Sequence, residues 1–336
     1  MCNNFYNIQK KFSNSNSFFS NPLKYIELIF VLIILGHLFI KKITKIKKMI
    51  RIFITCFIAL SLGVNVYADM KDLTLKEISE RTSAFASNLI PGEGDTEISI
   101  DFREGASPDY SILAVREIMP MDDGKLFTQF SLFNNETNKD ERITGNLGFG
   151  MRKLSSDKTW LIGLNNFYDQ DIGEGHSRTS FGIEARSAVL DFHLNRYLAL
   201  GHGLDGEKVL DGWDTQFSSQ VPYYHWANVF LNSYKWEGED RTDIEGLKYG
   251  SEMILNPNLI LEAAYDDKEL KGLEDEWYAK LIFIYPGRKG PTALDGRSSS
   301  MWKEEKDMSG QMLTKVKRQN KIMVEFRGSS TVSRTD

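Results

Sequence analysis

The side chains that could carry out chemistry in this sequence are few, and their spacing fits none of the common reactions. The sequence beyond Ala68 contains four histidines, with no HExxH or His-x-His spacing to favour a metal site: His176, His193, His202 and His225. Asp191 and His193 share one face of an expected strand and would suit a hydrolase, but no serine partner can be singled out. We therefore expect a protein that is not an enzyme, with no catalytic residues, no metal site and no cofactor.

The stretch DQDIGEGHS, which begins at Asp169, superficially resembles a calcium-binding loop. The glutamate that such a loop carries at its far end is missing here. We therefore interpret the stretch as part of a hairpin and not as a metal site.

A set of charged residues shares one face of a single expected strand. Arg178, Glu184 and Arg186 alternate with a small or apolar face made of Thr179, Phe181, Ile183 and Ala185. An alternation of this kind places the charges in water or in a water-filled interior and the apolar face elsewhere. Together with Arg152, they are our candidates for charges that line a lumen, where a salt-bridge network would stiffen the wall.

The elements that would position these residues are strands with an unusual aromatic spacing. Residues 143–171 read ITGNLGFGMRKLSSDKTWLIGLNNFYDQD, two runs of alternating residues around a polar break. Trp160 and Tyr168 lie eight residues apart, about 26 Å along a strand and about 20 Å vertically at a tilt of roughly 40°. Trp277 and Tyr285 repeat that spacing. These four rings are candidates for two aromatic girdles, although one such hairpin would also suit a soluble sheet with one wet face.

The whole segment 93–286 favours a membrane barrel over a soluble sheet. The connections between its alternating segments are short after even-numbered segments and mostly longer after odd-numbered ones, as in an outer-membrane barrel. We therefore expect an all-β, transmembrane antiparallel barrel of about twelve strands. The expected strands cover residues 96–103, 109–118, 125–133, 142–153, 158–168, 177–187, 188–198, 212–221, 226–236, 244–254, 258–266 and 276–285.

The sequence before the barrel differs in charge from the rest. Its first 68 residues hold nine of the 41 Lys and Arg but one of the 46 Asp and Glu, so residues 69–336 carry 32 minus 45, or −13. Residues 49–68 have the form of a secretory signal, with a basic start, an apolar run and expected cleavage after Ala68. Residues 1–48 would then be a misassigned extension upstream of Met49, or else an inner-membrane anchor built on residues 28–40.

Residues 69–92 follow the expected cleavage point and predict one short amphipathic helix in the periplasm. Both cysteines, Cys2 and Cys56, precede that point. The exported chain would therefore be free of thiols, which removes disulfides and thiolate chemistry from consideration.

Several stretches resemble the β-domain of inverse autotransporters, the family of intimin and invasin. They are GNLGFGMRKL, WLIGLNNFYDQD, FGIEARSAVLDFHLNRY, GWDTQFSSQVP and KVKRQNKIMVEF, which together span about residues 75–326. The resemblance implies a twelve-stranded outer-membrane barrel, a periplasmic amino terminus, a linker that threads the pore and an extracellular passenger of immunoglobulin-like domains. Because the chain ends with FRGSSTVSRTD soon after the last matching stretch, we expect no encoded passenger.

Residues 287–336 are expected to be a C-terminal linker or tail. Fully extended, they would reach up to about 170 Å against the 40 to 45 Å of a bilayer, so they could thread the pore, and a tail that stays in the periplasm is equally open. We expect a translocator in the bacterial outer membrane, and the alternative is a standalone pore or a structural envelope barrel. Its partners would be membrane lipids and lipopolysaccharide, the barrel-assembly machinery and periplasmic chaperones, and nothing indicates nucleic acid.

Overall fold

The structure is a computed structural model that describes residues 91–103, 108–137, 140–173, 175–201, 206–238, 242–268 and 275–326. The expected extension at 1–48, the signal peptide at 49–68 and nearly all of the helix at 69–92 lie outside the described residues. These three assignments therefore stay predictions. Within the described ranges, no helix combines the length and the hydropathy needed to cross a membrane.

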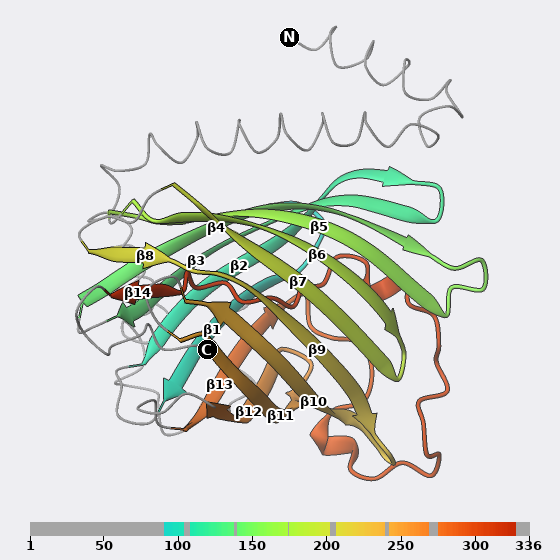
Figure 1. Cartoon of the computed structure of the whole chain (residues 1–336). Helices are drawn as coiled ribbons and strands as arrows, with labels where there is room; N and C mark the ends of the chain where they lie inside the picture. The colour runs from blue at the N-terminus through green and yellow to red at the C-terminus, as the bar shows by residue number, and fades with distance from the viewer. Residues whose placement is uncertain are drawn as a thin grey trace, which may run out of the picture. The chain divides into compact units, whose positions relative to one another are not determined.

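Twelve strands close into one antiparallel barrel, in which each strand pairs with its neighbours in sequence and the first pairs with the last (Figure 1). The expected fold class and strand number are confirmed. A separate two-stranded sheet is formed by β8 (Glu207–Val209) and β14 (Val324–Phe326). The barrel strands are β1 (Thr96–Arg103), β2 (Asp109–Met121), β3 (Gly124–Thr137), β4 (Asp140–Leu154), β5 (Trp160–Asp171), β6 (Ser177–Ser187), β7 (Leu190–Leu200), β9 (Asp211–Val221), β10 (Tyr224–Glu237), β11 (Ile244–Asn256), β12 (Leu259–Lys268) and β13 (Glu276–Tyr285).

The alternation of side chains along each strand explains why the sheet closes. In β5, Trp160, Ile162 and Leu164 are exposed, whereas Leu161 and Gly163 between them are buried. Strands β6, β7, β9 and β10 repeat this pattern with exposed apolar residues on the outer surface. A closed sheet leaves no unpaired edge, so an apolar outer surface can face lipid with every ladder group satisfied.

The connections at one end of the barrel are tight turns. Four of them have two residues, and Asp123 and Tyr223 adopt positive φ angles of 53° and 68° there. The turn between β4 and β5 is longer and is closed by Asp157, which accepts hydrogen bonds from the Ser155 hydroxyl at 2.6 Å and from Thr159. These hydrogen bonds lower the pKa of the Asp157 carboxyl. We call this the turn end of the barrel.

The connections at the other end, the loop end, are mostly longer and differ from the expectation at one hairpin. The sequence predicts a polar loop over residues 134–141, but β3 continues to Thr137 and β4 begins at Asp140. The two strands keep pairing beyond the apolar band, since main-chain ladder bonds do not require apolar side chains. The connection between β7 and β9 carries the short strand β8.

Two glycines on the inner face let large aromatic rings fill one side of the barrel. A Cβ atom built on Gly148 would stand 2.3 Å from the Phe167 ring, and one on Gly150 would stand 2.3 Å from the Phe127 ring. Both rings are fully buried. Because Gly148 and Gly150 of β4 have no side chains, they leave the space that Phe127 of β3 and Phe167 of β5 occupy.

The substitution Gly148→Ala should weaken the folded barrel by about 1–3 kcal/mol, because the new methyl group overpacks against Phe167. The change is measured as a lower temperature for conversion of the compact band to the unfolded band in a heat-modifiability gel. Gly310→Ala is the matched control, since nothing lies within 4 Å of a Cβ atom there. Equal conversion temperatures for the two variants would contradict the packing account.

Candidate functional site

The C-terminal segment of residues 308–326, which we call the lumen segment, runs through the interior of the barrel (Figure 1). At the turn end, the Met308 amide donates a hydrogen bond of 2.9 Å to the Lys158 carbonyl. At the loop end, Val324 pairs with Val209 of β8. Met312, Val316 and Met323, which lie between these points, are buried. The segment therefore spans the barrel from the turn end to the loop end.

Apolar residues of the lumen segment pack against one side of the wall. Met308 and Met312 form a buried cluster with Leu154 and Leu161. Farther along, Leu313 and Val316 belong to a buried cluster that also contains Leu113, Val115, Phe127 and Phe167. These wall residues come from β2 to β5, so residues 308–316 of the segment lie against that side of the lumen.

Arg152 connects the wall to the main chain of the lumen segment. Its Nε and Nη2 atoms donate to the two carboxylate oxygens of Glu184, at 2.5 and 3.2 Å. Its Nη1 atom donates to the carbonyl oxygens of Met312, at 3.0 Å, and Thr314, at 2.6 Å. The guanidinium group also stands over the Phe127 ring, 4.5 Å from its centroid. Glu184 therefore balances a buried charge whose remaining donors bind the segment.

Asp169 is shared between one arginine of the wall and one of the lumen segment. Its Oδ2 atom accepts hydrogen bonds from Arg178 Nε at 2.7 Å and from Arg318 Nη2 at 2.6 Å. Its Oδ1 atom accepts one from Asn146 at 2.7 Å. Arg318 also stands over the Phe167 ring, 4.3 Å from its centroid. All the charges here are buried, so each depends on the others for compensation.

Side chains of the wall also bind main-chain groups of the lumen segment. Arg178 Nη2 donates to the Gln319 carbonyl at 2.5 Å, and Asn146 Nδ2 donates to the Asn320 carbonyl at 2.9 Å. The Gln319 amide in turn donates to the hydroxyl oxygen of Tyr197 at 2.7 Å. An extended chain in a lumen has no partner strand, and these side chains satisfy its polar groups instead.

Each of four cations on the lumen segment meets a carboxylate of the wall, and these pairs fix the register of the segment. Arg318 binds Asp169, as described above. The other pairs are Lys315 with Glu97 at 2.8 Å, Lys317 with Asp191 at 3.8 Å and Lys321 with Asp109 at 2.6 Å. A shift of the segment by one residue would separate these charges in a poorly solvated space, which is costly. We call this set of pairs the charge ladder.

The loop end of the lumen segment is held by β8. The Leu210 amide donates to the Met323 carbonyl at 2.9 Å, and β8 and β14 pair antiparallel over three residues. Glu207 of β8 accepts two hydrogen bonds from Arg142 of β4, at 2.7 and 2.6 Å. The β8–β14 pair is thereby attached to the barrel wall.

The structure places the four candidate lumen charges inside the barrel, but it pairs them in ways that alternation alone did not predict. Arg152 and Glu184 bind each other, whereas Arg178 binds Asp169, a residue that we had assigned only to hairpin structure. Arg186 donates to the Thr314 hydroxyl at 2.7 Å. The charged stretch KVKRQNK was the signal for Arg318, although nothing in the sequence indicated its partner.

Three of the four candidate girdle residues lie exposed. Trp160 is 43%, Trp277 61% and Tyr285 40% exposed, but Tyr168 is only 3% exposed and its hydroxyl donates to Gln170 at 2.7 Å. Tyr168 lies on the same face of β5 as Trp160, but the alternation of residues along a strand does not show which side chains are covered by neighbours. Tyr168 is covered, whereas Trp160 is exposed. The girdle stays a prediction for the three exposed rings.

Asp191 and His193 lie next to different charged groups in the structure. His193 Nδ1 lies 3.8 Å from Glu184, whereas Asp191 lies near Arg186 and Lys317. Among the described residues, no group of three or more His, Cys, Asp and Glu side chains could hold a metal ion.

Comparison with known proteins places this arrangement in context. The family model of the inverse autotransporter β-domain matches residues 61–320. The chain is 25% identical over 229 residues to the inverse autotransporter adhesin YeeJ of Escherichia coli K12, covering 63% of this chain and 9% of that protein. It is 26% identical over 135 residues to invasin of Yersinia enterocolitica, covering 40% of this chain and 16% of invasin. The chain thus spans only a small part of the length of these two relatives.

A likeness to a solved structure bears on the fold. A chain from work on the in-meso crystallization of membrane proteins superposes with a TM-score of 0.54 at 19% identity. The match covers 69% of this chain and 100% of that one. At this identity the likeness supports the barrel fold.

The substitution Arg318→Met should loosen the lumen segment without removing the barrel, because Asp169 keeps Arg178 as a partner. We expect faster hydrogen exchange at the amides of residues 312–322, equivalent to a loss of about 1–3 kcal/mol in local stability. The measurement is hydrogen exchange with mass spectrometry on the full chain in detergent. Lys306→Met, which removes an exposed cation of the same tail outside the lumen, is the control. Exchange that matches the control would show that Arg318 does not hold the segment.

Proposed function

The chain belongs to the inverse autotransporter β-domain family, and we propose that its outer-membrane barrel carries a segment of its own chain through its lumen and then retains that segment as a plug. The single observation that supports this most strongly is the path of the lumen segment. Residues 308–326 enter at the turn end, bind the wall through the charge ladder and reach β8 at the loop end.

The direction of export follows from the topology of the barrel. In outer-membrane barrels the short turns face the periplasm and the longer loops face the outside. Strand β13 ends at the turn end, where Tyr285 pairs with Thr96, so the tail begins on the periplasmic side. The chain that follows Phe326 would then be delivered to the cell surface.

The mechanism we propose is physical and not catalytic. The described strands of the wall pair in a closed ladder, so a polar chain can pass inside without a cofactor or a nucleotide. The lumen offers carboxylates to the cations of the segment and side-chain donors to its carbonyl groups. These contacts would stop the segment in one register and give the stable end state of export.

We also propose partners that suit this location. The exposed apolar side chains of the outer surface, such as Ile162 and Leu231, would contact membrane lipid, and the polar loop end would face lipopolysaccharide. Barrel-assembly machinery and periplasmic chaperones would act before the barrel closes. Two relatives are named an inverse autotransporter adhesin and invasin.

A protein purified from outer membranes should begin at Asp69 if residues 49–68 are a secretory signal cleaved after Ala68. Amino-terminal sequencing measures this directly. An amino terminus upstream of residue 49 would instead support an inner-membrane anchor.

An epitope fused after Asp336 should be cut by protease added to intact cells, because the segment that precedes it crosses the barrel toward the loop end. An epitope in the β10–β11 loop should be cut in the same way, and one inserted at Ser156 in the β4–β5 turn should be protected. A heat-modifiability gel confirms that each barrel is folded. A protected epitope after Asp336 on a folded, correctly oriented barrel would contradict the proposal and favour a standalone barrel.

A further inference from the structure

The lumen segment leaves part of the barrel interior unfilled, and we propose that this unfilled part is a hydrated path that conducts small ions while the segment is in place. The segment packs on β2 to β6 through the apolar clusters, Asp169 and Arg178. Near the loop end, Met323 also packs on Tyr234 and Trp236 of β10. Two cavities lie beside the segment, and most of their wall residues come from the opposite side, which is formed by β9 to β13 and β1. This activity does not depend on whether the barrel exports a chain.

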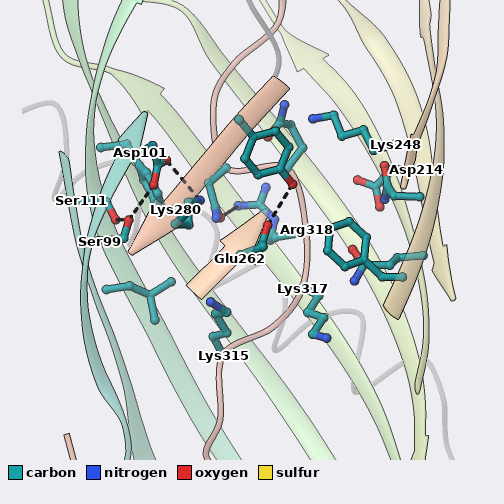
Figure 2. A pocket seen from close by; sticks show the side chains of 18 of the residues that line it. Ser99, Asp101, Ser111, Asp214, Lys248, Glu262, Lys280, Lys315, Lys317 and Arg318 are labelled. Carbon is teal, nitrogen blue, oxygen red and sulfur yellow. Dashed lines mark hydrogen bonds and ion pairs between the residues drawn. The ribbon is translucent and has the colours of Figure 1, made fainter. Parts of the chain in front are cut away.

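The two sides of the lumen differ in chemistry. The side that holds the segment carries Phe127 and Phe167 over interior glycines, which gives an apolar surface for Leu313 and Val316. The opposite side carries charged and hydroxyl groups. Its charges are bound mostly within the wall, as in the pairs Lys280 with Asp101 at 3.1 Å and Tyr278 with Glu262 at 2.9 Å (Figure 2). These groups satisfy one another within the wall, whereas Glu97 on the same side binds the segment through Lys315.

The two cavities follow the segment along most of the barrel. The first has a volume of about 150 Å³ and reaches Arg103 and Trp236, near the loop end. The second has a volume of about 140 Å³ and reaches Ala188 in the β6–β7 turn. Cavities lined by charged and polar groups hold water. A barrel of twelve strands is also intermediate in width between side-chain-filled barrels of about eight strands and open channels of about 16–18.

The two cavities share part of their lining, and the segment contributes to this shared part. Four charged residues line both cavities: Glu97 and Glu252 from the wall, and Lys315 and Lys317 from the segment. We call these four residues the waist. Lys315 reaches across to Glu97 at 2.8 Å, so the waist is held by one rung of the charge ladder. Charged side chains at a constriction set ion selectivity, and here acids and bases from two separate elements oppose each other.

The test uses the full chain, purified from outer membranes and reconstituted in planar lipid bilayers under a gradient of KCl. The unmodified protein should conduct. Glu252→Gln removes a negative charge from the waist and should lower the ratio of K⁺ to Cl⁻ permeability by at least about twofold, and Lys317→Gln should raise it by a similar factor. Glu245→Gln is the matched control, because Glu245 pairs with Lys235 in a partly exposed contact near the loop end and lines neither cavity. It should leave the ratio unchanged.

A second variant distinguishes a path beside the segment from a lumen that the segment has left. Val209→Cys with Val324→Cys joins two residues that pair in register and pack together, and the disulfide would hold the segment at the loop end. Conductance that persists in the oxidised form, with opposite selectivity shifts for the two waist variants, supports the path. Conductance that disappears on oxidation, folded protein that does not conduct, or waist variants that behave as the control would overturn it.

Discussion

The carboxylate of Asp169, shared between Arg178 of the wall and Arg318 of the lumen segment, is the interaction on which the rest of the interior depends. Three charges and an amide are buried within hydrogen-bond distance of one another. An isolated charge in such a place would cost several kcal/mol, so each charge of the group is stabilised by the others. The wall alone provides one cation for this carboxylate, and the second comes from a residue 149 positions farther along the chain.

Strand register explains how the wall prepares this site before the segment arrives. Asn146 of β4 lies opposite Asp169 of β5, and Asp169 lies opposite Arg178 of β6, so the three side chains form a row across the inner face. A slip of one residue in either pairing would turn one of them to the outer face. The apolar outer surface therefore helps to fix the strand register. A slip of one residue would place charged groups in lipid and would also separate Asn146, Asp169 and Arg178.

The sequence was sufficient for the strands but not for the contacts between them. Alternation predicted residues 96–103, 177–187 and 276–285 with the observed bounds, because one face of each strand is apolar and the other is not. It did not predict that Arg178 pairs with Asp169, since partners across a ladder depend on register and not on parity. The path of the tail could not be predicted for the same reason. Arg318 and Asp169 are far apart in sequence, and the sequence does not show which acid of the wall pairs with Arg318.

The two ends of the lumen segment are held by different forces, and this division determines where its register comes from. At the loop end, β14 pairs with β8 through main-chain hydrogen bonds, which form with almost any sequence. In the middle, Lys315, Arg318 and Lys321 each require a carboxylate at one height of the wall. Main-chain pairing can therefore hold the segment but cannot select its position, whereas the charge ladder can. Since Arg142 fixes β8 to the wall through Glu207, the strand pair and the ladder share one frame, and the segment settles where both are satisfied.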